Sequence, residues 1–206
     1  MLTLKFITNL LEFGKYIGLI ICALFGSEKS KREIEKRKAL RDKETNIHNH
    51  KIISSIYPII QLGLNSHKEI DRVSIFKSHN GNGIPTAGNL SYTSCLQEVC
   101  TDKTTPIQQR WQKIPSDHLM MDVLTTTMRE GHAVLKLSES KNGVLKDFCS
   151  GNNIIGVLSV PIQYSATGFL FLNFCSSTAE DLSGVNGVLF EAHSVAGRIS
   201  DLLSNK

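Results

Sequence analysis

Two adjacent apolar runs near the C-terminal end constrain the fold of this chain more than any other feature. They are Ile154–Gln163 and Thr167–Cys175, separated by Ser165 and Ala166. Both runs are nearly continuous in Ile, Val, Leu and Phe, which is typical of strands that are covered on both faces of a sheet. A short polar break between two such runs predicts a hairpin. The chain is therefore expected to contain a sheet with this hairpin at its centre.

Weaker periodic patterns predict the strands and helices that accompany the hairpin. The predicted strands are residues 72–79, 92–100 and 133–137. The predicted helices are residues 52–64, residues 116–129 with Ser116 as the cap, and residues 178–203. Pro58 predicts a kink in the first helix or a late start of its regular part, and residues 143–149 leave helix and strand both open. This order of elements predicts an α+β domain.

The N-terminal segment Phe6–Phe25 has the length and hydropathy of a membrane-spanning helix. Its 20 residues are enough to cross a hydrocarbon core of about 30 Å. Its charged residues, Glu12 and Lys15, lie on one helical face and continue a polar stripe that is expected to face a partner helix. We expect residues 1–26 to form one transmembrane helix. A helix lying in the membrane plane remains the alternative, because this stripe runs along residues 4–15.

A basic stretch follows the apolar segment. Residues 27–43 contain eight of the 23 Lys and Arg residues and four of the 19 Asp and Glu residues, so the other residues carry fifteen charges of each sign. The positive-inside rule then predicts a single-pass protein of the cell (inner) membrane, with a basic juxtamembrane stalk at residues 27–46 and a cytoplasmic domain at residues 47–206. The stalk is expected to attract anionic membrane lipid. A nucleic-acid partner is not expected, because the domain has no basic excess of its own.

The domain resembles the GAF family of ligand sensors. The sequence Asp71–Phe76 followed by a His-Asn-Gly turn resembles the opening of GAF domains, and Gly156–Ile162 with Thr167–Leu172 resembles their core hairpin. This resemblance covers residues 47–204. It implies an antiparallel sheet with a small-molecule pocket on one face and with the N- and C-terminal helices, which often pair in dimers, on the other.

Four residues are candidates for ligand binding at such a pocket. His79 and Asn80 stand where a strand leaves the sheet, although Asn80-Gly81 also suits a turn for backbone reasons alone. Glu98 ends the second strand and is either an acceptor in the pocket or a solvated edge residue. Trp111 is the single tryptophan and forms either a pocket wall or core packing.

Catalysis is not expected from this sequence. The five cysteines have no CxxC or zinc-ligand spacing. Some GAF relatives reduce free methionine sulfoxide with paired cysteines, and Cys95, Cys100 and Cys149 invite that comparison. Cys95 and Cys100 lie five residues apart, so a regular strand would point them to opposite faces. The motif of cyclic-nucleotide-binding GAF domains and the cysteine of bilin-carrying relatives are not recognisable. Neither is a kinase, cyclase or DNA-binding output module.

These observations predict a membrane-anchored, non-catalytic GAF-like module that acts in sensing or regulation. The expected partners are membrane lipid and a second copy of the chain, with a small-molecule ligand and a protein partner as further candidates. The sequence does not specify a cofactor. The alternative is a membrane-active phage or prophage protein for lysis or membrane remodelling, in which the striped N-terminal helix acts and the domain regulates it.

Overall fold

The computed structural model describes residues 33–37, 52, 54–79, 91–165 and 168–204. The chain divides into two units, Met1–Lys51 and Ile52–Lys206. The predicted transmembrane helix and most of the stalk lie outside the described residues. The described part of the stalk, residues 33–37, is helical, and Arg37 lies 3.8 Å from the carboxylate of Glu33. Within the described ranges, no helix combines the length and the apolar character that a membrane crossing requires.

The second unit is built on a six-stranded antiparallel sheet with the strand order β3-β2-β1-β6-β5-β4. The strands are β1 (Arg72–His79), β2 (Tyr92–Cys100), β3 (Ile114–Pro115), β4 (Ala133–Lys136), β5 (Gly156–Ser165) and β6 (Gly168–Ser176). The predicted hairpin is β5 and β6, and β6 pairs with β1 at the middle of the sheet. The α+β class and the antiparallel sheet are therefore confirmed.

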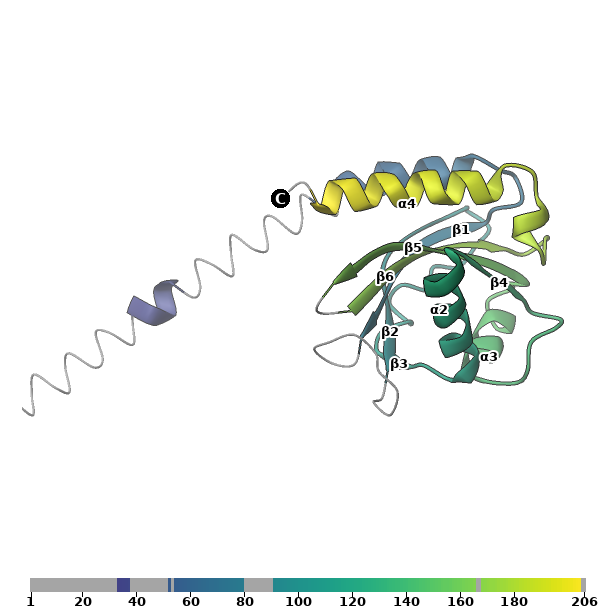
Figure 1. The fold of residues 1–206 in the computed structure, drawn as a ribbon, viewed down its shortest axis with the longest axis horizontal. Coiled ribbons are helices and arrows are strands. Elements are labelled where there is room, and N and C mark those ends of the chain that lie inside the picture. Colours follow the sequence, from purple (N-terminus) through teal and green to yellow (C-terminus); the bar gives the residue numbers. More distant parts are fainter. Residues whose placement is uncertain (1–32, 38–51, 53, 80–90, 166–167, 205–206) are drawn as a thin grey trace, which may run out of the picture. The chain divides into compact units, whose positions relative to one another are not determined.

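Two helices cover one face of this sheet. They are the N-terminal helix, residues 54–65, and α4 (Val188–Ser204), which lie side by side in Figure 1. Their apolar faces meet those of the strands in one core, in which Ile60, Val195 and Phe174 are fully buried. A Cβ atom at Gly63 would lie 3.0 Å from the Phe174 ring, so this glycine lets the N-terminal helix approach the sheet closely.

The other face is covered by α2 (His118–Glu130), by α3 (Val144–Ser150) and by the connection between β2 and β3 (Figure 1). Its core is aromatic. The ring of Phe171 stacks on that of Phe76 across neighbouring strands and on that of Phe169 along β6, with centroids 5.6 Å apart in each pair. Tyr164 of β5 stacks on Phe169 at 4.8 Å. Both faces of the sheet are thus buried, as the continuous apolar runs predict.

Helix starts are where the sequence prediction is wrong. The cap of α2 is Asp117 rather than Ser116, and its carboxylate accepts a hydrogen bond from the backbone N–H of Met120 at 2.8 Å. The closing helix begins at Val188 rather than Thr178. The hydroxyl of Ser176 accepts from the N–H groups of Thr178 and Ala179, which holds the chain in a turn there. A short 3₁₀ turn (Leu182–Gly184) follows before α4.

Residues 143–149, for which the sequence pattern allows either a helix or a strand, fall largely in α3.

Candidate functional site

The face on which the resemblance places a pocket is closed by the protein's own side chains. The cavity that remains there has a volume of about 30 Å³ and is lined by residues such as Phe76, Trp111 and Cys149. Phe76 packs edge-on against Trp111 with centroids 5.9 Å apart, and Phe148 does so at 4.0 Å. Such a volume holds about two water molecules, whereas pockets for small organic ligands are about 300–1,000 Å³.

Trp111 is part of this interior. Its side chain is 2% exposed, and its indole N–H has no hydrogen-bond partner among the described residues. Its backbone carbonyl accepts from the N–H of Cys95 at 2.8 Å, which ties the segment between β2 and β3 to the sheet. Trp111 thus packs in the core and also forms a wall of the small cavity.

His79 lies at the last position of β1, at the opposite end of that strand from Arg72. Its ring is 6.2 Å from the ring of Tyr92. Burial lowers the pKa of His79, and the charges of Lys77 and Lys113 lower this pKa further. Asn80 lies outside the described residues. The structure therefore does not bring His79 together with Glu98 and Trp111.

A β-bulge decides where Glu98 points. The register of β2 against β1 shifts so that Phe76 pairs with Cys95 and Ile75 pairs with Gln97, which leaves Leu96 unpaired. Beyond the bulge, side chains change face relative to a regular strand. Glu98 consequently lies on the same face as Arg72. Cys95 and Cys100 also share that face, so the expectation that they point to opposite faces is wrong.

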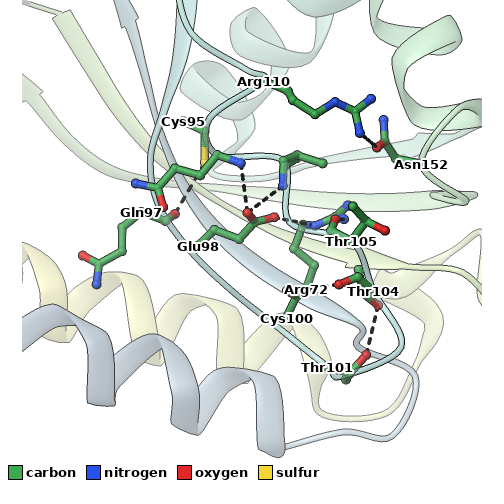
Figure 2. Close-up of polar contacts among 12 residues, drawn as sticks. Arg72, Cys95, Gln97, Glu98, Cys100, Thr101, Thr104, Thr105, Arg110 and Asn152 are labelled. Atoms are coloured by element: carbon green, nitrogen blue, oxygen red, sulfur yellow. Dashed lines mark hydrogen bonds and ion pairs between the residues drawn. The ribbon is translucent and has the colours of Figure 1, made fainter.

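Arg72 and Glu98 form a buried ion pair on that face. Nε of Arg72 is 2.7 Å from Oε1 of Glu98, and the two side chains are 1% and 3% exposed. The other carboxylate oxygen accepts from the backbone N–H groups of Ile107 and Gln108, at 2.8 and 3.0 Å, and Arg72 donates to the Thr105 carbonyl at 2.7 Å (Figure 2). Nη1 of Arg72 is buried and has no hydrogen-bond partner in the described part of the chain. The pair fixes the segment after β2 to the start of β1.

Above this ion pair lies an open cleft of about 440 Å³. We call it the polar cleft. It is lined by four chain segments, residues 68–72, 103–105 with Arg110, 151–154 and 175–178. Its walls carry hydroxyl, amide and cationic groups, among them Lys103, Arg110 and Asn152. Arg110 donates to the Asn152 side-chain oxygen at 3.1 Å, and its guanidinium lies 5.9 Å above the Phe148 ring. The cleft has the size of a small-ligand site.

None of the cationic residues of the polar cleft is marked by a motif in the sequence. Lys103 and Arg110 lie in a connection without periodic pattern, and Arg72 opens a predicted strand. The one available signal was an arginine in a strand that is otherwise buried, since a buried charge requires a partner.

Of the buried thiols, Cys175 lines both the polar cleft and the small cavity, and Cys149 lines the small cavity. Burial raises the pKa of Cys149 to about 12 and that of Cys175 to about 12, although the Arg72 charge opposes the second shift. Burial also raises the pKa of Cys95, and the charge of Glu98 adds to this effect. Thiolate chemistry requires the opposite shift.

Comparisons with known proteins agree with this geometry at the level of the fold. No protein-family model and no curated protein matches the chain. Among solved structures it is similar to a GAF domain/HD domain protein from Geobacter sulfurreducens, at 9% identity and a TM-score of 0.53, over 74% of this chain and 92% of that one. It is also similar to the GAF domain region of a candidate membrane protein from Geobacter sulfurreducens PCA, at 10% identity and a TM-score of 0.51, over 78% and 97%. The fold is GAF-like.

Proposed function

We propose that this chain is a membrane-anchored, non-catalytic regulatory module that binds a small polar ligand in the polar cleft. The observation that carries this proposal is the contrast between the two cavities. The interior cavity holds about 30 Å³ and the polar cleft about 440 Å³. Of these two cavities, only the polar cleft falls in the range of small-molecule sites, which is about 300–1,000 Å³. A third hollow of about 570 Å³ beside α2 and β4 also has this size, but its lining has no excess of Lys and Arg over Asp and Glu.

A regulatory role is supported by the segment that the two cavities share. Lys103, Thr104 and Thr105 line the polar cleft, whereas Ile107 and Trp111 of the same connection pack in the interior. Its anchor is the Arg72–Glu98 pair. A ligand that moves the cleft side of this segment would therefore change the packing of Trp111. Such a two-sided element can couple binding to a change elsewhere in the domain.

Membrane anchoring rests on the apolar segment at residues 1–26 and its basic flank. These residues lie outside the described ranges, so the support comes from hydropathy and charge. A neighbour in fold is the GAF domain region of a candidate membrane protein, which is compatible with the same arrangement here. No observation on the described residues favours the membrane-active phage or prophage alternative.

The test is mass spectrometry of small molecules retained by the purified full chain. Thr178 is an exposed residue of the polar cleft, so Thr178→Trp should fill part of the cleft and release the retained molecule. Thr125→Trp makes the same change at an exposed position of α2 and should retain it. A molecule retained equally by both variants, or none retained by the unaltered chain, would contradict the proposal.

A further inference from the structure

The lining of the polar cleft is strongly unbalanced in charge. Four cationic side chains, those of Lys68, Arg72, Lys103 and Arg110, face one carboxylate, that of Asp71. One oxygen of Asp71 accepts hydrogen bonds from both the backbone N–H and the hydroxyl of Ser177. This carboxylate thus serves to connect the start of β1 to the chain after β6. The cleft is therefore a positive site.

Nearby carboxylates balance two of these four positive charges. Arg72 is neutralised by Glu98 beneath the cleft, and Lys68 lies 3.9 Å from Glu69. Arg110 has a neutral partner, the side-chain oxygen of Asn152, and Lys103 is an exposed residue of the cleft wall. Two full positive charges, on Lys103 and Arg110, thus have no carboxylate within salt-bridge distance in the described part of the chain.

Arg110 is held in place before any ligand arrives. Its contact with Asn152 uses one of its five N–H donors, and its guanidinium plane lies over the Phe148 ring. An arginine that is fixed in this way loses little conformational freedom when it binds an oxyanion. Beneath it, Arg72 lines the same cleft and is 1% exposed, with a buried Nη1 atom that lacks a hydrogen-bond partner among the described residues. Because Glu98 balances its charge, this second arginine adds an unpaired N–H donor, rather than net charge, at the cleft floor.

The rest of the lining is rich in neutral hydrogen-bonding groups. The residues that carry them are Thr104, Thr105, Asn153, Ser176 and Thr178. Hydroxyl and amide groups can both donate and accept, so they suit a ligand with several hydroxyl groups of its own. A dianion matches the two unpaired cations, and phosphate is an oxyanion that arginine binds through a bidentate fork and lysine binds as a point charge.

We propose that the polar cleft binds a soluble phosphate monoester of a polyhydroxylated small molecule, with the phosphate held by Arg110 and Lys103. This inference rests on the proposed function, since it names the class of ligand for the same cleft. The hydroxyl-bearing part of the ligand lies along the threonine and asparagine side chains. The 440 Å³ of the cleft accommodates a molecule of the size of a sugar phosphate.

The experiment measures binding of ribose 5-phosphate to the full chain in phosphatidylcholine nanodiscs by isothermal titration calorimetry. Ribose serves as the uncharged reference. Arg110→Gln and Lys103→Gln should each weaken binding of ribose 5-phosphate about tenfold or more, because each removes a charge-assisted contact. The matched controls are Arg129→Gln and Lys141→Gln, which make the same changes at exposed positions outside the cleft and should leave the affinity unchanged.

The outcomes separate this inference from the proposed function. Binding of ribose equal to that of ribose 5-phosphate, or unchanged affinity in Arg110→Gln, would overturn the phosphate assignment. A second set of nanodiscs that contain phosphatidic acid distinguishes a soluble ligand from a lipid headgroup. Equal affinity in both sets supports a soluble ligand, and weaker affinity in the acidic set would assign the site to lipid. If no phosphate ester binds while a retained molecule is still displaced by Thr178→Trp, the proposed function stands and this inference fails.

Discussion

The Arg72–Glu98 pair is the residue-scale feature on which the polar cleft depends. Taking two charges out of water is costly, and the cost is offset here by their contact and by two backbone N–H donors to Glu98. Such a pair contributes little net stability, but loss of one partner leaves the other charge buried and alone. The pair therefore makes the position of the segment after β2 a requirement of the fold.

Glu98→Gln should destabilise the domain by about 3–5 kcal/mol, because Arg72 then stays buried without a counter-charge. The measurement is urea unfolding of residues 46–206, which include the whole second unit. Glu139→Gln is the control, since Glu139 forms an exposed ion pair with Lys136 at 3.7 Å. It should cost less than about 1 kcal/mol. Equal losses in the two variants would show that the Arg72–Glu98 pair is not desolvated in solution.

The cysteines give a second prediction at this scale. With a pKa of about 12, Cys149 and Cys175 hold only ~10⁻⁴ of their thiol as thiolate at a pH four units lower. Iodoacetamide near pH 8 should therefore leave both unmodified in the native domain and modify both after denaturation. Peptide mass spectrometry measures this residue by residue. Rapid native alkylation of either would reopen the case for thiol chemistry.

The raised thiol pKa values also set the sign of a pH effect. The unfolded chain loses these protons above a pH of about 9 while the folded domain keeps them. The corresponding stability is thus fully present below the ordinary pKa and is lost as the pH rises toward about 12.

At the scale of elements, β6 organises both cores. It pairs with β1 and with β5. On one face of the sheet, the ring of Phe171 stacks between those of Phe76 and Phe169. On the other face, Phe174 belongs to the core beneath the N-terminal helix and α4. Every second side chain of a strand serves one face, so a central strand contributes to two layers at once. This position explains why its sequence is apolar almost throughout.

Phe171→Ala should cost about 3–5 kcal/mol, because Phe171 is fully buried and its truncation leaves a cavity between the rings of Phe76 and Phe169. Met128→Ala is the control on α2, where Met128 is 37% exposed and lies outside the proposed dimer contact. That change should stay within about 0.5 kcal/mol. Urea unfolding of residues 46–206 measures both. If Phe171→Ala lowers the free energy of unfolding by less than about 1 kcal/mol, the central position of Phe171 in the core is contradicted.

At the scale of the whole molecule, the dimer remains a proposal with a revised surface. Ile56 and Ile59 belong to the apolar face of the N-terminal helix, but both are buried within the subunit, at 6% and 9% exposure, and so do not face a partner. The apolar side chains that remain exposed on the two helices are Tyr57, Leu62 and Phe190. We propose that these form the dimer contact.

Phe190→Lys should therefore shift residues 46–206 from dimer to monomer in sedimentation at micromolar concentration, without loss of stability. Ile56→Lys does not test the contact, because a lysine there would disrupt the core. Met128→Lys is a suitable control, since Met128 is an exposed apolar residue of α2. A monomeric unaltered fragment would end the dimer proposal.

The proposed membrane topology gives the last prediction. The basic stretch after the apolar segment predicts, by the positive-inside rule, that the domain lies in the cytoplasm. A C-terminal reporter that is active only outside the cytoplasm should stay silent, while a cytoplasmic reporter at the same position should be active. Reversed signals would contradict the topology, and release of the protein into the soluble fraction would contradict the anchor itself.

The sequence by itself determined the class and the central hairpin. Strand periodicity and apolar helix faces are local properties, since each strand or helix must hide its own apolar side chains wherever it packs. For this reason β1 and β2 were predicted with the bounds that the structure shows. The starts of the helices are predicted less accurately, because each depends on one or two hydrogen bonds. One such bond makes Asp117 rather than Ser116 the cap of α2. Two bonds to the Ser176 hydroxyl hold the chain after it in a turn instead of a helix.

Only the tertiary structure decided the site. The bulge at Leu96 puts Glu98 on the same face as Arg72, and the periodicity of the sequence does not predict a bulge. The closure of the interior results from the summed volumes of aromatic side chains from several elements. The polar cleft joins four segments that are distant in sequence, so its charge and volume exist only once the sheet has brought them together.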